Sequence, residues 1–238
     1  MKTRYTIVIG LQGGDESEVI DSIVGLFLGK IHDEGGPIYV SVAGFPSSSN
    51  WRNYIATEHS LDRRDIQSIV GGDIGVYIVS HGSGNNVGGL SAAHLAALIQ
   101  ELGFTEIRKL CLVACNTGNS LKNATEEGVQ TEINQSYIGT LCRAMYPMTP
   151  MVAGYAGFVT VAHPKYSGRI GVQTSSGGWQ WKRDHGSAAA GKKLTKKAHK
   201  QGRITVMTPE ARNSIKVIAQ SLDGHTVNLV GLDQWHDS

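Results

Sequence analysis

Two segments of the sequence place a chemically reactive side chain directly after an apolar run. Residues 76–80 read VYIVS and are followed by His81, and residues 110–114 read LCLVA and are followed by Cys115. A thiol beside an imidazole can lose its proton and act as a nucleophile, and the protonated imidazole can then deliver a proton to a leaving amine. The chemistry that such a pair would support is covalent cleavage of an acyl bond.

The sequence between the two segments predicts that these side chains meet. Residues 91–102 begin with Ser91, a helix-capping residue type, and then place leucine and isoleucine at the spacing of one helix face. A strand, helix, strand unit makes a right-handed crossover, which brings the carboxyl ends of both strands to one edge of a parallel sheet. We expect His81 and Cys115 side by side at that edge, with the N–H groups of Gly82 and Cys115 as oxyanion donors.

Each of these residues alone has a simpler interpretation. A cysteine at a strand end is more often a small packed residue than a nucleophile. A histidine after a strand can be an ordinary turn residue with no catalytic role. We interpret Cys111, which precedes Cys115 by four residues on the same strand face, and Cys142 as core residues. The catalytic interpretation is favoured by the pair, because both members follow strands that are separated by one helix.

The remaining pattern predicts a single α/β domain over residues 1–238, with a mainly parallel central sheet. Apolar runs predict strands at 5–9, 38–42, 107–114, 151–153, 158–162 and 226–232, a hairpin at 169–182, and helices near 15–31, 138–145 and 208–222. We expect a core that carries the reactive pair at residues 1–161, a basic hairpin region at 162–203, and a closing helix and strand at 204–238. The expected architecture is a three-layer sandwich.

Composition argues against several other classes of protein. Hydrophobic residues make up 40% and charged residues 18%, which is ordinary for a soluble globular chain. The apolar runs are much shorter than the roughly 20 residues of a membrane helix, and we recognise no signal peptide. Three cysteines and nine scattered histidines predict neither a disulfide framework nor a metal site. No glycine-rich phosphate loop follows a strand.

Positive charge is concentrated in one segment near the C-terminus. The whole chain carries a net charge of +2, but residues 182–203 carry about +7, which leaves about −5 for the rest. Five of the lysines follow the spacing i, i+1, i+4, i+5, i+8, which would form one stripe on a helix. The stripe is either a solvated face or a site for phosphate groups. The candidate phosphate ligands are Lys182, Arg183, Lys192, Lys193, Lys196, Lys197, Lys200 and Arg203.

The residues around the reactive pair resemble a known group of peptidases. The blocks VYIVSHGS at 76–83 and LVACNTG at 112–118 are similar to the histidine-glycine and alanine-cysteine blocks of the caspase-like superfamily, which includes caspases, clostripain, gingipains, separase and CHAT domains. The segments GGLS at 88–91 and VAGYAGF at 152–158 most resemble the self-processing cysteine protease domain of clostridial and RTX toxins. The resemblance covers about residues 5–161 and is weak beyond them.

This resemblance implies a caspase-like α/β/α sandwich with a C-terminal β-hairpin extension. It implies a self-processing cysteine endopeptidase that uses His81 and Cys115 as its dyad and requires no cofactor for the chemistry. The related toxin domains are activated by inositol hexakisphosphate, which here would bind the basic segment at 182–203 beside the hairpin.

The same resemblance places a substrate-binding pocket beside the strand that carries Gly154, Tyr155 and Phe158. We find no acidic residue that would select Arg or Lys and no arginine pair that would select Asp. Small and apolar neighbours fit a leucine-like side chain better. The expected partner is a peptide or protein, the chain itself included, in a bacterial toxin or effector that works in the cytoplasm or is delivered into a host cytosol.

Two other functions remain open at this point. An inactive caspase-like interaction module would keep the fold and leave Cys115 no more reactive than Cys142. A polyanion-binding or nucleic-acid-binding protein would use the basic segment, and the reactive pair would be incidental. Nucleic acid is the less favoured partner, and no membrane span is expected.

Overall fold

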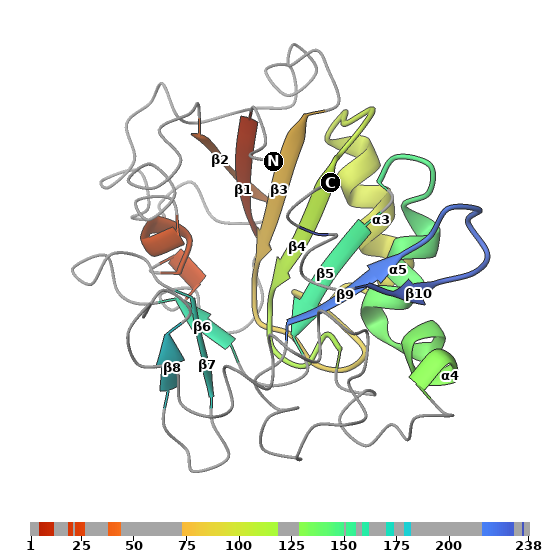
Figure 1. The fold of residues 1–238 in the computed structure, drawn as a ribbon. Coiled ribbons are helices and arrows are strands. Elements are labelled where there is room, and N and C mark those ends of the chain that lie inside the picture. Colours follow the sequence, from red (N-terminus) through yellow and green to blue (C-terminus); the bar gives the residue numbers. More distant parts are fainter. Residues whose placement is uncertain are drawn as a thin grey trace.

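The computed structural model describes the elements that surround the reactive pair and leaves parts of the chain outside the description. The described residues are 5–11, 19–20, 22–26, 38–43, 73–118, 129–149, 151–155, 159–161, 170–173, 179–181, 216–230 and 235. They form a seven-stranded sheet in the order β10-β9-β5-β4-β3-β1-β2 and a three-stranded sheet in the order β6-β7-β8 (Figure 1). No helix in these ranges is long and apolar enough to cross a membrane.

The centre of the large sheet is parallel. Its parallel strands are β2 (Ile38–Ala43), β1 (Tyr5–Leu11), β3 (Ile74–Val79), β4 (Lys109–Val113) and β5 (Met151–Tyr155). Two antiparallel strands, β9 (Lys216–Gln220) and β10 (Asn228–Leu229), complete it beside β5. Strands buried on both faces need apolar residues at successive positions, which explains the runs 7–11 in β1, 74–79 in β3 and 110–113 in β4. The predicted α/β class and mainly parallel sheet are confirmed.

Helices cover both faces of this sheet in the described part of the chain. On one face α3 (Ala92–Glu101) and α5 (Tyr137–Ala144) pack against the strands, and on the other the helical residues 19–20 and 22–26 do so. The short helix α4 (Val129–Gln135) precedes α5. Ser91 caps α3 as predicted, because its hydroxyl accepts the His94 N–H at 3.3 Å.

The small sheet contains the predicted hairpin. Strands β7 (Ile170–Gln173) and β8 (Trp179–Trp181) pair antiparallel, which confirms the hairpin at 169–182. Strand β6 (Val159–Val161) pairs with β7, so that β6 lies at the edge of this sheet as far as the described residues show.

The predicted helix at 208–222 is wrong over residues 216–220, which form strand β9. The residues 208–215 lie outside the described part of the chain. Val217, Ile218 and Ala219 are all fully buried, with Ile218 on the opposite face of the sheet from the other two. Because both faces are buried, the strand shows no alternation of polar and apolar residues. Leu222, the last residue of the predicted helix, is 69% exposed.

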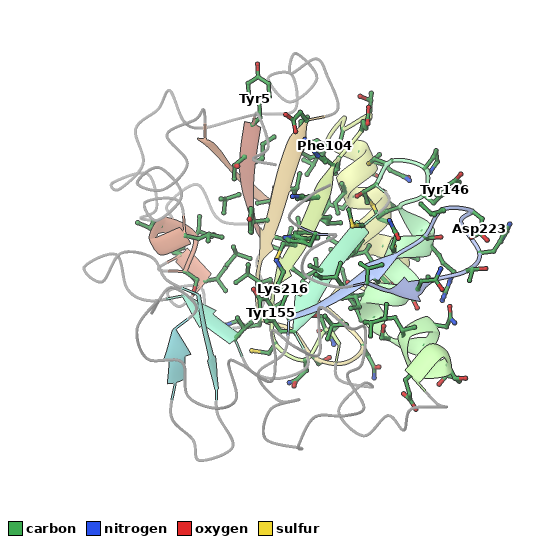
Figure 2. All side chains as sticks on the ribbon, viewed as in Figure 1. Tyr5, Phe104, Tyr146, Tyr155, Lys216 and Asp223 are labelled. Carbon is green, nitrogen blue, oxygen red and sulfur yellow. The ribbon has the colours of Figure 1, made fainter. Side chains whose placement is uncertain are left out.

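The carboxyl ends of the parallel strands share one edge of the large sheet. Tyr5 starts β1 and Tyr155 ends β5, and Figure 2 shows them at opposite ends of the sheet. At the carboxyl edge the Ser80 hydroxyl donates to the Leu11 carbonyl at 3.0 Å, which joins the ends of β3 and β1. At the opposite edge Arg108 and Asp73 form an ion pair of 2.6 Å.

Candidate active site

The register of β3 and β4 brings the two reactive residues together. Val79 pairs with Val113, and the Ser80 N–H continues the ladder by donating to the Val113 carbonyl at 3.4 Å. His81 and Gly82 follow directly on the β3 side and Ala114 and Cys115 on the β4 side, and Gly82 lies against the backbone of Cys115. Adjacent strands lie roughly 4.8 Å apart, so the two backbones are neighbours at the carboxyl edge. Both residues are partly exposed there.

Gly82 contacts the backbone of the cysteine segment. A Cβ atom at this position would lie 2.7 Å from the Cys115 carbonyl oxygen and 2.9 Å from the Ala114 Cβ. Real Cβ atoms do not approach so closely, so the two strand ends can meet only because residue 82 has no side chain.

The chain after β3 folds into a compact turn at residues 81–90, which we call the histidine turn. Its backbone is closed by two hydrogen bonds of 2.8 Å, from the Gly88 N–H to the His81 carbonyl and from the Ser83 N–H to the Asn86 carbonyl. The Ser83 hydroxyl also accepts the Asn86 N–H at 3.3 Å. All of these partners lie within the turn itself.

Those two hydrogen bonds also orient the Gly82 peptide. They flank the pair formed by Gly82 and Val87, so this pair is of the non-hydrogen-bonded antiparallel type. In such a pair the N–H groups point away from the partner. Among the described residues, the Gly82 N–H donates to no other group, which suits it to bind an oxyanion.

Residues 115–118, which we call the cysteine turn, are fastened to a distant strand through the thiol. The Val159 N–H donates to the Cys115 Sγ at 3.4 Å, and the thiol reaches the Val159 carbonyl at 3.5 Å. Because the N–H and C=O of one strand residue point to the same side, Val159 turns the edge of β6 opposite β7 toward the thiol.

The cysteine turn is also fastened to the end of β5. The hydroxyl of Thr117, a fully buried residue, accepts the Tyr155 N–H at 2.9 Å, and the Gly118 N–H donates to the Tyr155 carbonyl at 2.8 Å. Between them and the nucleophile, Asn116 has a φ of 59°, a backbone conformation that few residues other than glycine adopt. Sequence reasoning missed Thr117, because its partner is a main-chain group 38 residues away.

Of the predicted substrate-binding residues, Gly154 and Tyr155 end strand β5 at this edge, and both are buried. Tyr155 is 1% exposed, and burial, with Cys111 and Tyr77 nearby, holds the pKa of its phenol well above the usual range. Gly154 packs so tightly that a Cβ atom would collide with the Thr117 hydroxyl. Phe158 lies outside the described residues. The role of all three in substrate binding stays a prediction.

The other two cysteines are core residues, as we interpreted them. Cys111 is 1% exposed and lies in the same core cluster that Cys115 borders, while Cys142 is fully buried on the other face of the sheet. Burial raises the pKa of the Cys142 thiol to about 11. Cys115 alone of the three is partly exposed.

The expectations on a metal site and on phosphate ligands concern residues that lie partly or wholly outside the described part of the chain. Within the described ranges, no group of three or more His, Cys, Asp or Glu residues could hold a metal ion. The predicted phosphate ligands, Lys182, Arg183, Lys192, Lys193, Lys196, Lys197, Lys200 and Arg203, all lie outside those ranges.

A thiol and an imidazole at neighbouring strand ends of an α/β sheet, with a glycine N–H beside them, are the arrangement of a thiol-dependent hydrolase. The chain belongs to the peptidase C80 family, whose model matches residues 43–170, more than half of its length. The predicted class, a cysteine peptidase, is thereby confirmed. The match includes His81 and Cys115 and ends before the basic segment. A comparison with curated proteins finds no match.

Proposed function

We propose that this chain is a self-processing cysteine endopeptidase of the caspase-like fold, with Cys115 as the nucleophile and His81 as the general acid and base. The observation that supports the proposal is that the adjacent parallel strands β3 and β4 end just before His81 and Cys115, with Gly82 packed against the Cys115 backbone. Membership of a peptidase family adds that the bond cleaved is a peptide bond.

The geometry supports the two half-reactions of a thiol peptidase. His81 takes the thiol proton, the Cys115 sulfur attacks the peptide carbonyl, and the resulting oxyanion accepts hydrogen bonds from the N–H groups of Gly82 and Cys115. The protonated imidazole then gives its proton to the departing amine, which leaves a thioester. Water, deprotonated by His81, attacks this thioester and releases the acid and the thiol.

The substrate is proposed to bind along the edge of β6 beside the thiol. Because the Val159 N–H and carbonyl lie 3.4 and 3.5 Å from the Cys115 Sγ, the peptide would displace Val159 from the thiol as it binds. Val159 already turns one edge of β6 toward Cys115, and an extended peptide could hydrogen-bond along that edge. The pocket beside Gly154, Tyr155 and Phe158 would take a leucine-like side chain. Because Tyr155 is buried, it would support this pocket from below.

A small anionic polyphosphate is proposed as the activator. The basic segment at 182–203 directly follows β8, and β8 belongs to the sheet whose β6 contacts the thiol. A ligand that bound this segment and ordered the hairpin could therefore change the surroundings of Cys115 by shifting a two-state equilibrium. The proposed setting is a bacterial toxin or effector that acts in a cytosol.

Mass spectrometry of the purified chain tests the catalytic proposal. Wild type should cut itself and a leucine-containing peptide, and Cys115→Ala and His81→Ala should abolish both activities with little change in the free energy of unfolding. Cys111→Ala and Cys142→Ala are the matched controls and should retain activity. Cleavage that survives in Cys115→Ala would refute the mechanism, and a wild-type Cys115 that is no more readily alkylated than Cys142 would favour an inactive interaction module.

The same assays, run with and without inositol hexakisphosphate at low and high salt, test the activator. Activity and thermal stability should rise with the ligand at low salt, and reversal of Lys193, Lys196 and Lys197 to Glu should remove both effects. If stabilisation survives the charge reversal, the basic segment is not the binding site.

A further inference from the structure

We propose that Thr117 is a positioning residue for the oxyanion site, because its buried hydroxyl holds the peptide unit between Ala114 and Cys115 in place. This inference rests on the proposed function, in which the Cys115 N–H is one of the two oxyanion donors. It assigns a role to a side chain that touches neither the thiol nor the substrate.

The hydroxyl of Thr117 has one proton to donate and lone pairs to accept with. It accepts the Tyr155 N–H at 2.9 Å, so its own proton is directed to the other partner within reach, the Ala114 carbonyl at 3.5 Å. That carbonyl and the Cys115 N–H belong to one planar peptide unit. A hydrogen bond of this length is weak, but it restrains the plane in which the Cys115 N–H points.

The peptide group that follows Thr117 is hydrogen-bonded as well. The Thr117 carbonyl accepts the Ile138 N–H at 3.3 Å from the first turn of α5, and the Gly118 N–H donates to the Tyr155 carbonyl at 2.8 Å. Asn116, which joins Cys115 to Thr117, has a φ of 59°, a left-handed conformation that asparagine adopts more readily than other residues with a side chain. The bonds of Thr117 and Gly118 hold the backbone that follows it. Thr117 thus connects the nucleophile to β5 and α5.

Gly154 completes the arrangement from the side of β5. A Cβ atom at this position would collide with the Thr117 hydroxyl and with the Ile138 side chain. The space for the hydroxyl therefore exists because residue 154 is a glycine. Thr117 and Gly154 should behave as one unit, so the effects of Thr117→Val and Gly154→Ala on turnover should be far less than additive.

The test compares Thr117→Val, which keeps the shape and loses the hydroxyl, with Thr117→Ser, which keeps the hydroxyl. An oxyanion contact is made in the transition state, so Thr117→Val should lower kcat about tenfold or more while KM changes little. A peptide aldehyde ending in leucinal forms a tetrahedral oxyanion with the thiol and should bind about tenfold more weakly. Alkylation of Cys115 by iodoacetamide forms no oxyanion, so its rate should stay within about twofold. Thr117→Ser should restore all three towards the wild-type values.

The combination of readouts separates positioning from a general loss of structure. If Thr117→Val leaves kcat and aldehyde binding unchanged, or if alkylation falls by the same factor as kcat, the inference is overturned. The proposed function fails in a different way, because wild type would then neither cut peptides nor show selective alkylation of Cys115.

Amide hydrogen exchange keeps the positioning role testable even if wild type is inactive. Thr117→Val should speed exchange at Tyr155 and within 115–118 but not within β3, and Thr117→Ser should not. Unchanged exchange at these amides would refute the role that we assign to the hydroxyl.

Discussion

The histidine turn and the cysteine turn meet at one edge of the sheet but are built in opposite ways. The histidine turn closes on itself, because Gly88 and Asn86 bond to residues only a few positions away. The cysteine turn has its main partners in Tyr155 and Val159, which lie 38 and 44 residues from the residues that they contact. The backbone bonds that close the histidine turn are therefore local, and the Tyr137 hydroxyl of α5 adds one distant bond to its Leu90 carbonyl at 3.1 Å. The cysteine turn forms only when β5 and β6 are in place.

This difference predicts which half of the site a change in the small sheet would reach. The histidine turn closes through its own backbone bonds and contacts α5 through Tyr137, so we expect it to keep its shape whenever β3, α3 and α5 are folded. The cysteine turn instead depends on β6, which pairs with β7 and through it with β8. A change in the small sheet would reach the thiol through Val159. The contact between the two turns is the place to test this division first.

The largest effect is expected from Gly82→Ala, because this substitution pushes the two turns apart. The new Cβ would meet the Cys115 carbonyl oxygen at 2.7 Å and the Ala114 Cβ at 2.9 Å, and both are rigidly held. We expect kcat/KM to fall by about a hundredfold or more, as displacement of reacting groups by about 1 Å does. Urea unfolding should show a loss of about 1–3 kcal/mol from overpacking.

Gly89→Ala is the matched control within the same turn. Gly89 has a φ of 75°, but a Cβ there would meet nothing within 4 Å. The strain should lower stability by about 1 kcal/mol, with kcat/KM nearly unchanged. Equal losses of activity in both variants would mean that the distance between the turns is not what matters.

A smaller effect is expected from Val159→Pro, which removes the N–H that donates to the thiol. This N–H points away from β7, so a proline at the sheet edge leaves the pairing of β6 with β7 intact. An N–H donor favours the thiolate, so the alkylation rate of Cys115 at neutral pH should fall by about tenfold. Thr160→Pro, whose N–H faces β7, is the control and should destabilise the small sheet instead. An unchanged alkylation rate in Val159→Pro would show that β6 does not influence the nucleophile.

The same division explains what could be predicted from the sequence. The strand ends at His81 and Cys115, the cap at Ser91 and the hairpin that contains β7 and β8 follow from short-range patterns, and the structure has them where expected. Strand β9 was mistaken for a helix because its apolar residues face two cores at once, which hides the strand period. Thr117 and Val159 could not be found from the sequence. Thr117 acts through a hydroxyl that accepts a main-chain N–H 38 residues away, and Val159 acts through its own backbone, which carries no sequence signal.

The smallest effect is expected from Ser83→Ala, the counterpart of Thr117→Val in the histidine turn. The Ser83 hydroxyl accepts the N–H groups of Asn85 at 3.2 Å and Asn86 at 3.3 Å, and both bonds are exposed to solvent. Water can replace an exposed acceptor, so the loss of stability should be about 0.5–1 kcal/mol or less. The backbone bond from the Ser83 N–H to the Asn86 carbonyl does not involve the side chain and should keep the turn closed.

Turnover should therefore change less than about threefold in Ser83→Ala, because no buried donor loses its partner. In Thr117→Val the Tyr155 N–H does lose its partner, and that N–H is buried where water cannot replace it. Side-by-side measurement of kcat and urea unfolding for the two variants compares a local turn with a non-local one by removing a single hydroxyl from each. If Ser83→Ala reduced kcat as much as Thr117→Val, the histidine turn would depend on its side chains as strongly as the cysteine turn does, and the division between the two halves of the site would be wrong.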